Sequence, residues 1–180
     1  MRRLAFVALF ILSACSTVPV PDGFRMNKYK APVPSYVPGG ETISISEAVI
    51  LKEKGAIFVD VIGSGKLLTP GIDDEWLVVR PHMSIPDSHW LPDVGRGALT
   101  TKQQAYFEQS LEALSDGDKT KPLVFFCLKS CWMSWNATKR AAAMGYQRLY
   151  WLPDGKDGWE AAGLPLKQVK PFSGGGVVSE

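Results

Sequence analysis

A short apolar run that breaks into a cysteine-containing loop is the feature that most constrains the fold of this chain. Leu123–Phe126 has the length and apolarity of a buried strand, and Met133–Met144 is a helix-like run that ends at Gly145. Between them lies the loop Cys127–Trp132. A strand that turns tightly into a helix brings backbone N–H groups and the positive end of the helix dipole to the loop. This environment lowers the pKa of a thiol and favours thiolate chemistry.

Strand-like and helix-like segments alternate through the middle of the chain. The predicted segments are a helix at 48–54 capped by Ser44 or Ser46, a strand at 57–62, a short strand at 77–79, a helix that begins with a capping box at 101–104, the strand and helix described above, and a strand at 148–152. Residues 154–158 are expected to form a turn. This order predicts an α/β fold of three layers, with a central, mostly parallel sheet flanked by helices.

We expect residues 1–14 to be a lipoprotein signal peptide. Two arginines precede residues 4–12, which are apolar but too short for a bilayer span of about 20 residues. Cys15 completes a Leu-Ser-Ala-Cys sequence that resembles a bacterial lipobox, in which the cysteine is lipidated. The alternative is an ordinary signal peptide cleaved near Ala14. Ser16 follows the cysteine, and in a Gram-negative organism this implies a periplasmic protein anchored to the outer membrane.

Removal of the signal peptide changes what the composition implies. The 180 residues carry 20 Lys and Arg against 18 Asp and Glu, and residues 1–14 hold two of the arginines and no acid. The remaining 166 residues are formally neutral, so binding to nucleic acid is not predicted. Lipidation of Cys15 leaves Cys127 and Cys131. Because an exported pair faces an oxidising compartment, we expect a disulfide between them at rest.

The chain divides into a tether, a domain and a tail. Residues 15–40 hold five of the thirteen prolines and are predicted to be an extended tether, although three aromatic residues suggest that part of it packs on the domain. Residues 41–167 are expected to form the domain. Residues 168–180 are expected to form a flexible C-terminal tail.

This arrangement resembles the rhodanese-like domain. The pieces that carry the resemblance are Ile57–Val61, Ile85-Pro86-Asp87, Val124–Cys127, Gly145-Tyr146, Gly158-Trp159 and Gly163-Leu164-Pro165. They cover roughly residues 41–167. The resemblance implies a three-layer domain whose site lies at Cys127, at the carboxyl end of a strand.

Within that superfamily the chain is similar to the exported Cys-Cys-Trp motif proteins associated with pyrroloquinoline-quinone-dependent catabolism. The closer match is carried by Cys127 with Cys131–Asn136, by Trp90–Pro92 and by Tyr150–Trp159. The family label places two residues between the cysteines, whereas this chain has three. The match implies a link to quinoprotein alcohol oxidation, with an exported quinoprotein dehydrogenase or its cytochrome as partner. No residue set specifies the quinone, so no cofactor is predicted.

Cys127 is the predicted nucleophile and Cys131 its resolving thiol, in a sulfurtransferase or a thiol–disulfide oxidoreductase. A typical sulfurtransferase loop has an arginine near the position of Trp132, and without it the loop is a poor oxyanion clamp. Phosphatase chemistry is therefore not predicted, and sulfur transfer is weakened. One alternative is a disulfide that only shapes the loop of a non-catalytic binding module. Another is a metal site completed by His82 or His89, although the spacing gives no zinc signature.

The other predicted site residues are the loop residues Leu128, Lys129, Ser130 and Trp132, together with Asp60. Lys129 either lowers the pKa of a thiolate or is a solvated loop lysine. Trp132 either offers a hydrophobic platform to a partner or packs against the domain. We expect Asp60, at a strand end, to bond loop backbone rather than to perform chemistry.

Overall fold

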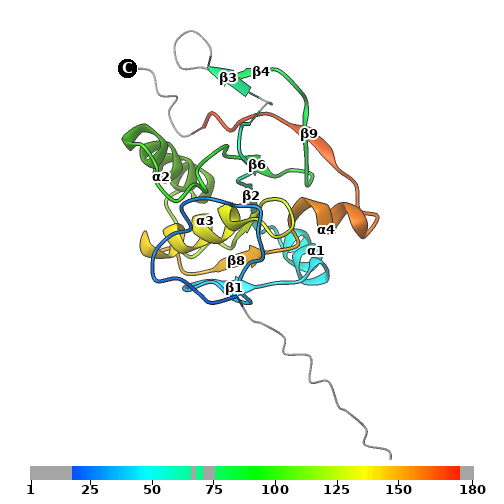
Figure 1. Ribbon diagram of the computed structural model, residues 1–180. Coiled ribbons are helices and arrows are strands. Elements are labelled where there is room, and N and C mark those ends of the chain that lie inside the picture. The colour runs from blue at the N-terminus through cyan, green and yellow to red at the C-terminus, as the bar shows by residue number, and fades with distance from the viewer. Residues whose placement is uncertain (1–17, 66–67, 71–75, 175–180) are drawn as a thin grey trace, which may run out of the picture.

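A five-stranded parallel sheet lies at the centre of the described part of the chain (Figure 1). In spatial order the strands are β1 (Glu41–Thr42), β8 (Leu149–Leu152), β7 (Leu123–Phe126), β2 (Ile57–Asp60) and β6 (His89–Trp90). Each pair of neighbours is parallel. The computed structural model describes residues 18–65, 68–70 and 76–174. Because β7 is the third of the five strands, the loop that follows it emerges at the middle of the sheet's carboxyl edge.

Helices cover both faces of this sheet. The described helices are α1 (Ile45–Glu53), α2 (Thr101–Ser115), α3 (Trp132–Ala143) and α4 (Gly155–Ala161). Because successive side chains of a strand point to opposite faces, Val59 and Phe125 share a core cluster with residues of α2 and α3. Phe58 and Val124 pack instead with residues of α1 and α4. The predicted three-layer α/β fold with a mostly parallel sheet is confirmed.

Two antiparallel strand pairs lie outside the central sheet. β3 (Leu68–Pro70) pairs with β4 (Trp76–Val78), and β5 (His82–Ser84) pairs with β9 (Lys167–Val169). Beyond β9, the backbone of Phe172 donates to the Trp90 carbonyl at 2.8 Å and accepts from the Tyr106 hydroxyl at 2.8 Å. The start of the predicted flexible tail is therefore packed on the domain up to Phe172.

Two local predictions are wrong in detail. The cap of α2 is Thr100, which forms a complete capping box with Gln103, rather than Thr101 with Gln104. In the predicted turn at 154–158, Asp154 is the N-cap residue of α4 and residues 155–158 are its first part. That helix forms because Trp159 is buried in the core, and because the Lys156 amide donates to the Cys127 carbonyl at 2.8 Å.

The N-terminal strap, residues 18–37, contains no helix and packs on the domain, so it is not a free tether. It runs along α3 (Figure 1), where Val18 and Val33 pack against a cluster that contains Trp132 and Trp135. The indole N–H of Trp135 donates to the Tyr36 carbonyl at 3.0 Å. The aromatic residues of this segment predict that part of it packs on the domain, and the packed part begins at the first described residue, Val18.

Candidate active site

Cys127 and Cys131 lie together at the carboxyl edge of the sheet. Cys127 directly follows β7, and Cys131 is the N-cap residue of α3. Both are free thiols, and Cys127 Sγ donates a hydrogen bond to Cys131 Sγ at 2.7 Å. Only 2% of Cys127 and 6% of Cys131 is exposed. The structure thus describes a buried dithiol whose sulfurs are in contact, and the resting disulfide stays a prediction.

The two thiols differ in their surroundings. Burial raises the pKa of Cys127 well above its usual value, and its hydrogen bond to Cys131 and the Asp60 carboxylate act in the same direction. The pKa of Cys131 is lowered, chiefly because it accepts from Cys127, with further contributions from the backbone amide of Met133 and from Lys30. Of the two thiols, Cys131 is therefore the one whose surroundings favour the thiolate.

The loop between the cysteines is stabilised by contacts with residues 153–154. The Ser130 amide donates to the Pro153 carbonyl at 3.1 Å, and Ser130 adopts a left-handed φ of 53°. Leu128 packs against the core, and its backbone amide favours the anionic form of both thiols. The ammonium of Lys129 lies 3.3 Å from a carboxylate oxygen of Asp154. Lys129 is therefore a solvated, ion-paired loop lysine, the second of its two predicted roles.

Lys30 is a functional candidate that the sequence did not reveal. It forms an isolated antiparallel bridge with Cys131. Its ammonium donates to the Lys129 carbonyl at 2.6 Å and lies 3.5 Å from Asp157 Oδ2. No local motif signals such a residue, because it lies on the strap, which is far from the loop in sequence.

Asp60 organises the end of β2 rather than the thiols. One carboxylate oxygen accepts from the Ile62 amide at 2.8 Å, in agreement with the expected backbone bond. The other oxygen lies 2.7 Å from His82 Nε2 and accepts from the Ser84 hydroxyl. Both Asp60 and His82 are buried, and the His82 ring packs on Trp90. His82 is thus a structural partner of Asp60.

Trp132 and Trp135 are both buried, so neither forms an exposed platform. Their rings meet edge to face, 5.3 Å apart. The indole N–H of Trp132 donates to the Pro32 carbonyl at 3.0 Å. Of the two readings of Trp132, the structure supports packing, because the strap already occupies the surface that a partner would use.

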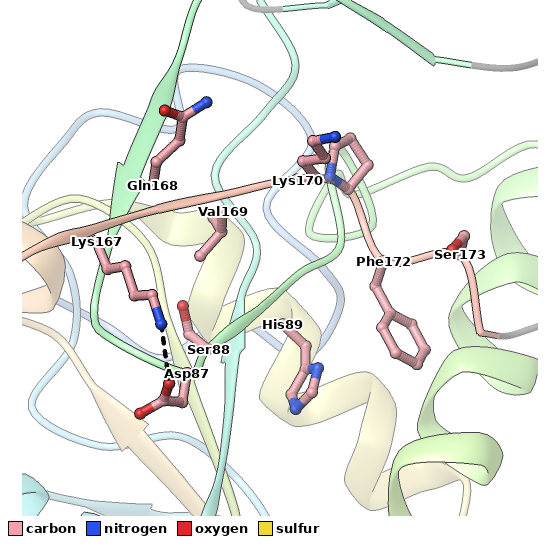
Figure 2. A pocket seen from close by; sticks show the side chains of 10 residues that line it. Asp87, Ser88, His89, Lys167, Gln168, Val169, Lys170, Phe172 and Ser173 are labelled. Carbon is pink, nitrogen blue, oxygen red and sulfur yellow. Dashed lines mark ion pairs between the residues drawn. The ribbon is translucent and has the colours of Figure 1, made fainter.

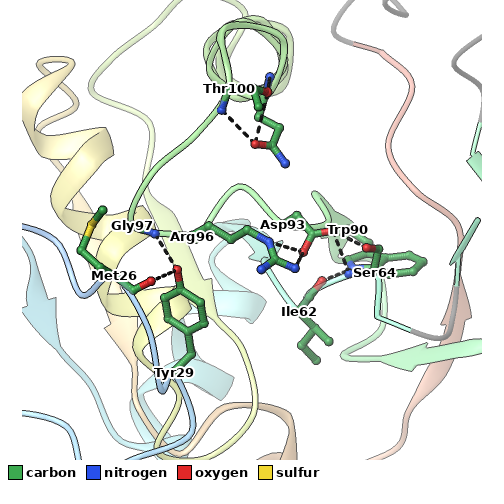
Figure 3. A network of polar contacts seen from close by, with 10 residues as sticks. Met26, Tyr29, Ile62, Ser64, Trp90, Asp93, Arg96, Gly97 and Thr100 are labelled. Atoms are coloured by element: carbon green, nitrogen blue, oxygen red, sulfur yellow. Dashed lines mark hydrogen bonds and ion pairs between the residues drawn. The ribbon is translucent and has the colours of Figure 1, made fainter. Parts of the chain in front are cut away.

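The loops that follow β2 and β6 are tied together beside α3 (Figure 3). Asp93 accepts from the amide and hydroxyl of Ser64 and from the guanidinium of Arg96, whose Nη2 lies 2.7 Å from Asp93 Oδ1. The Trp90 indole N–H donates to the Ile62 carbonyl at 2.7 Å. This network fixes the neighbourhood of the thiols without contributing a reactive group to them.

His89 lies in a separate open pocket formed with the C-terminal segment (Figure 2). Its ring meets Phe172 edge to face at 5.2 Å, and burial lowers its pKa. The lining of this pocket does not include the thiols. Within the described residues, no group of three or more His, Cys, Asp or Glu side chains is arranged to hold a metal ion. None of the helices in this part of the chain combines the length and the hydropathy of a membrane span.

Three solved structures are similar to this chain, and the third of them, with a TM-score of 0.50, shows the fold. A thiosulfate sulfurtransferase from Pseudomonas aeruginosa is 22% identical with a TM-score of 0.48; the match covers 76% of this chain but only 21% of that chain. A polysulfide-sulfur transferase from Wolinella succinogenes is 17% identical with a TM-score of 0.46, over 72% and 79% of the two chains. EanB, solved in complex with hercynine, is 21% identical with a TM-score of 0.50, over 78% and 34%.

No curated protein matches this chain. A sequence profile of the rhodanese-like domain matches residues 72–162, which is half of the chain and includes the strand, the cysteine loop and the helix after it. The chain therefore belongs to the rhodanese-like domain family.

Proposed function

We propose that this protein transfers sulfane sulfur through its dithiol, with Cys131 as the attacking thiolate and Cys127 as the resolving thiol. The observation that carries the proposal is the contact of the two sulfurs, 2.7 Å apart, at the carboxyl edge of the sheet and the N-terminus of α3. Membership of the rhodanese-like family supports sulfur transfer as the broad class of reaction.

The chemistry follows from the two thiols. The Cys131 thiolate attacks the outer sulfur of a persulfide or of thiosulfate, and the rest of the donor leaves as a thiolate or as sulfite, respectively. This step forms a persulfide on Cys131. The Cys127 thiol then attacks the inner sulfur of that persulfide, closes the Cys127–Cys131 disulfide and releases hydrosulfide, which carries away the thiol proton. A dithiol reductant supplies two electrons to reopen the disulfide.

This assignment reverses the roles that the sequence predicts for the two cysteines. The sequence favours Cys127 because it directly follows the strand. The surroundings favour Cys131, because it is the less buried thiol and accepts the hydrogen bond from Cys127. The Asp60 carboxylate disfavours a thiolate at Cys127. Thiol–disulfide exchange uses the same order of attack, with a disulfide in place of the sulfur donor.

The test is sulfide release by the reduced full-length protein in detergent, with thiosulfate or glutathione persulfide as donor and dithiothreitol as reductant. Cys131→Ser is expected to lower release to the rate of donor and dithiothreitol without protein. Cys127→Ser, mixed with the donor in the absence of dithiothreitol, is expected to accumulate a persulfide on Cys131, which mass spectrometry detects as a gain of one sulfur atom. A persulfide on Cys127 in the Cys131→Ser variant would restore the roles predicted from sequence, and no release with either donor would overturn sulfur transfer.

The burial of both thiols favours a second candidate function, a non-catalytic binding module whose closed disulfide shapes the loop. A module of this kind needs no access to the sulfurs. Only 2% of Cys127 and 6% of Cys131 is exposed. Equilibration in thiol/disulfide buffers separates the two functions. A reduction potential below about −300 mV would favour a structural disulfide, whereas a potential above roughly −230 mV would favour a reactive pair.

We further propose that the protein is exported and lipid-anchored through Cys15, and that its partner is an exported quinoprotein dehydrogenase or its cytochrome. The support is the lipobox-like sequence, which lies outside the described residues, and the similarity to the Cys-Cys-Trp motif proteins. Radiolabelled palmitate should enter the wild-type protein but not Cys15→Ala in a bacterial host. Deletion of the gene from a quinoprotein-using bacterium should slow growth on alcohols, and normal growth would count against the quinoprotein link.

A further inference from the structure

The strap brings Lys30 beside Cys131 through a defined backbone geometry. The Trp132 amide donates to the Tyr29 carbonyl at 2.8 Å, and the Ala31 amide donates to the Ser130 carbonyl at 3.2 Å. These two bonds flank the Lys30–Cys131 bridge, which is therefore a non-hydrogen-bonded antiparallel pair. Side chains of such a pair lie on the same face and closer together than in the hydrogen-bonded kind.

The position of the Lys30 ammonium agrees with that geometry. It donates to the carbonyl of Lys129, two residues before Cys131, at 2.6 Å. The carboxylate of Asp157, which also accepts from the Lys129 amide at 3.1 Å, lies 3.5 Å from it. Lys30 thus bridges the strap, the cysteine loop and α4, with its charge on the side of the loop where Cys131 lies.

The other charges around the pair are placed differently. Asp60, at the end of β2, carries a negative charge that disfavours the Cys127 thiolate. Asp154, the N-cap residue of α4, forms an ion pair with Lys129 of the cysteine loop. Arg25, also on the strap, lies over the Trp132 ring at 5.2 Å and donates to the Asn27 carbonyl. Among these described groups, Lys30 is the cation that shares a face with Cys131.

We propose that Lys30 is a positioning residue that stabilises the Cys131 thiolate, in place of the arginine that the cysteine loop lacks. The inference rests on the proposed function, because it names the residue that prepares the attacking sulfur of that same site. It makes the reactive centre a composite of two segments that are distant in sequence. A lysine serves here because it acts as a point charge on a single sulfur and does not have to clamp a planar oxyanion.

The test is a titration of the thiolate absorbance near 240 nm in the reduced full-length protein in detergent. The Cys127→Ser background isolates Cys131, with the Cys127→Ser/Cys131→Ser double variant as the reference to subtract. Lys30→Gln should raise the titration midpoint by about half a pH unit or more, less than for a buried pair because water and salt screen the ammonium. Lys30→Arg should restore the midpoint. Lys129→Gln, the matched loss of a neighbouring lysine, should leave it unchanged.

The outcomes separate the two proposals. An unchanged midpoint in Lys30→Gln, or an equal shift in Lys129→Gln, overturns the role of Lys30 whatever the sulfide assay shows. A midpoint shift in Lys30→Gln alone, in a protein that releases no sulfide, supports the role of Lys30 and refutes only the proposed sulfur transfer. Lys30 is an exposed side chain, so thermal unfolding should be unchanged in Lys30→Gln. If the serine background fails to fold, the same comparison is made in the wild-type dithiol.

Discussion

Gly155→Ala should destabilise the protein by forcing α4 away from the cysteine loop. Gly155 has a φ of +53°, and a Cβ on it would lie 2.1 Å from the Cys127 carbonyl oxygen and 2.9 Å from the Leu128 carbonyl carbon. Both contacts are with backbone atoms, so the clash can be relieved only if α4 and the cysteine loop move apart. The left-handed φ costs an alanine about 1–2 kcal/mol. Overpacking of this kind adds roughly 1–3 kcal/mol, which gives about 2–5 kcal/mol in total.

Gly163→Ala is the matched control for this prediction. Gly163 also has a left-handed φ, +74°, but a Cβ there would meet nothing within 4 Å. Both variants lose the same chain entropy in the unfolded state, so the difference between them measures the clash. Urea unfolding followed by tryptophan fluorescence gives both free energies. For a chain of this size the Gly155→Ala loss corresponds to a fall in Tm of roughly 4–20 °C. Equal losses in the two variants would refute the close approach of α4 to Cys127.

Three further substitutions test the packing around the site. Asp60→Ala leaves the Ile62 amide, His82 and Ser84 without their buried acceptor. It should lower the free energy of unfolding, measured by urea titration, by roughly 3–6 kcal/mol. A loss below about 1 kcal/mol would contradict the network. Burial lowers the pKa of His89 from 6.5 in the folded protein. As the pH falls, His89 is therefore protonated first in the unfolded state, and the free energy of unfolding of the wild-type protein should decrease below about pH 6.5. His89→Gln should lose that part of the acid dependence in melts between about pH 5 and 8, and an unchanged slope would contradict it. Trp132→Ala should cost roughly 3–5 kcal/mol and expose the strap to limited proteolysis, whereas a strap that stays protected would show that Trp132 does not hold it.

The sheet and the cysteine loop could be predicted because their signals are local. The apolar run Leu123–Phe126 is the strand β7, with the predicted bounds, since four consecutive buried residues need no distant partner to be recognised. The helix after the loop begins one residue earlier than predicted, at Trp132. Thr100 and Thr101 each have a glutamine three residues later, so the pattern alone did not decide which one caps α2.

The parts that were missed depend on contacts between distant segments. Asp154–Gly158 carries turn signals, and residues 155–158 become helical because Trp159 enters the core and Gly155 fits against Cys127. The role of Lys30 depends on a bridge between the strap and the loop, which no periodicity in either segment encodes. The pKa difference between the cysteines likewise follows from burial and from Asp60, and neither is visible in the spacing of the two residues.

The packed strap changes what a lipid on Cys15 would mean for the site. A free tether over residues 15–40 would let the domain move far from its anchor. Val18 already packs near the tryptophans, so two residues separate it from the proposed anchor, and the chain from Cys15 to Val18 spans at most about 11 Å. The strap that carries Lys30 would then hold the dithiol close to the membrane surface. A protein partner would have to meet the site at that surface, whereas a small sulfur donor would not. Membrane anchoring should therefore change the rate of sulfur transfer from a protein donor and leave the rate with glutathione persulfide unaltered.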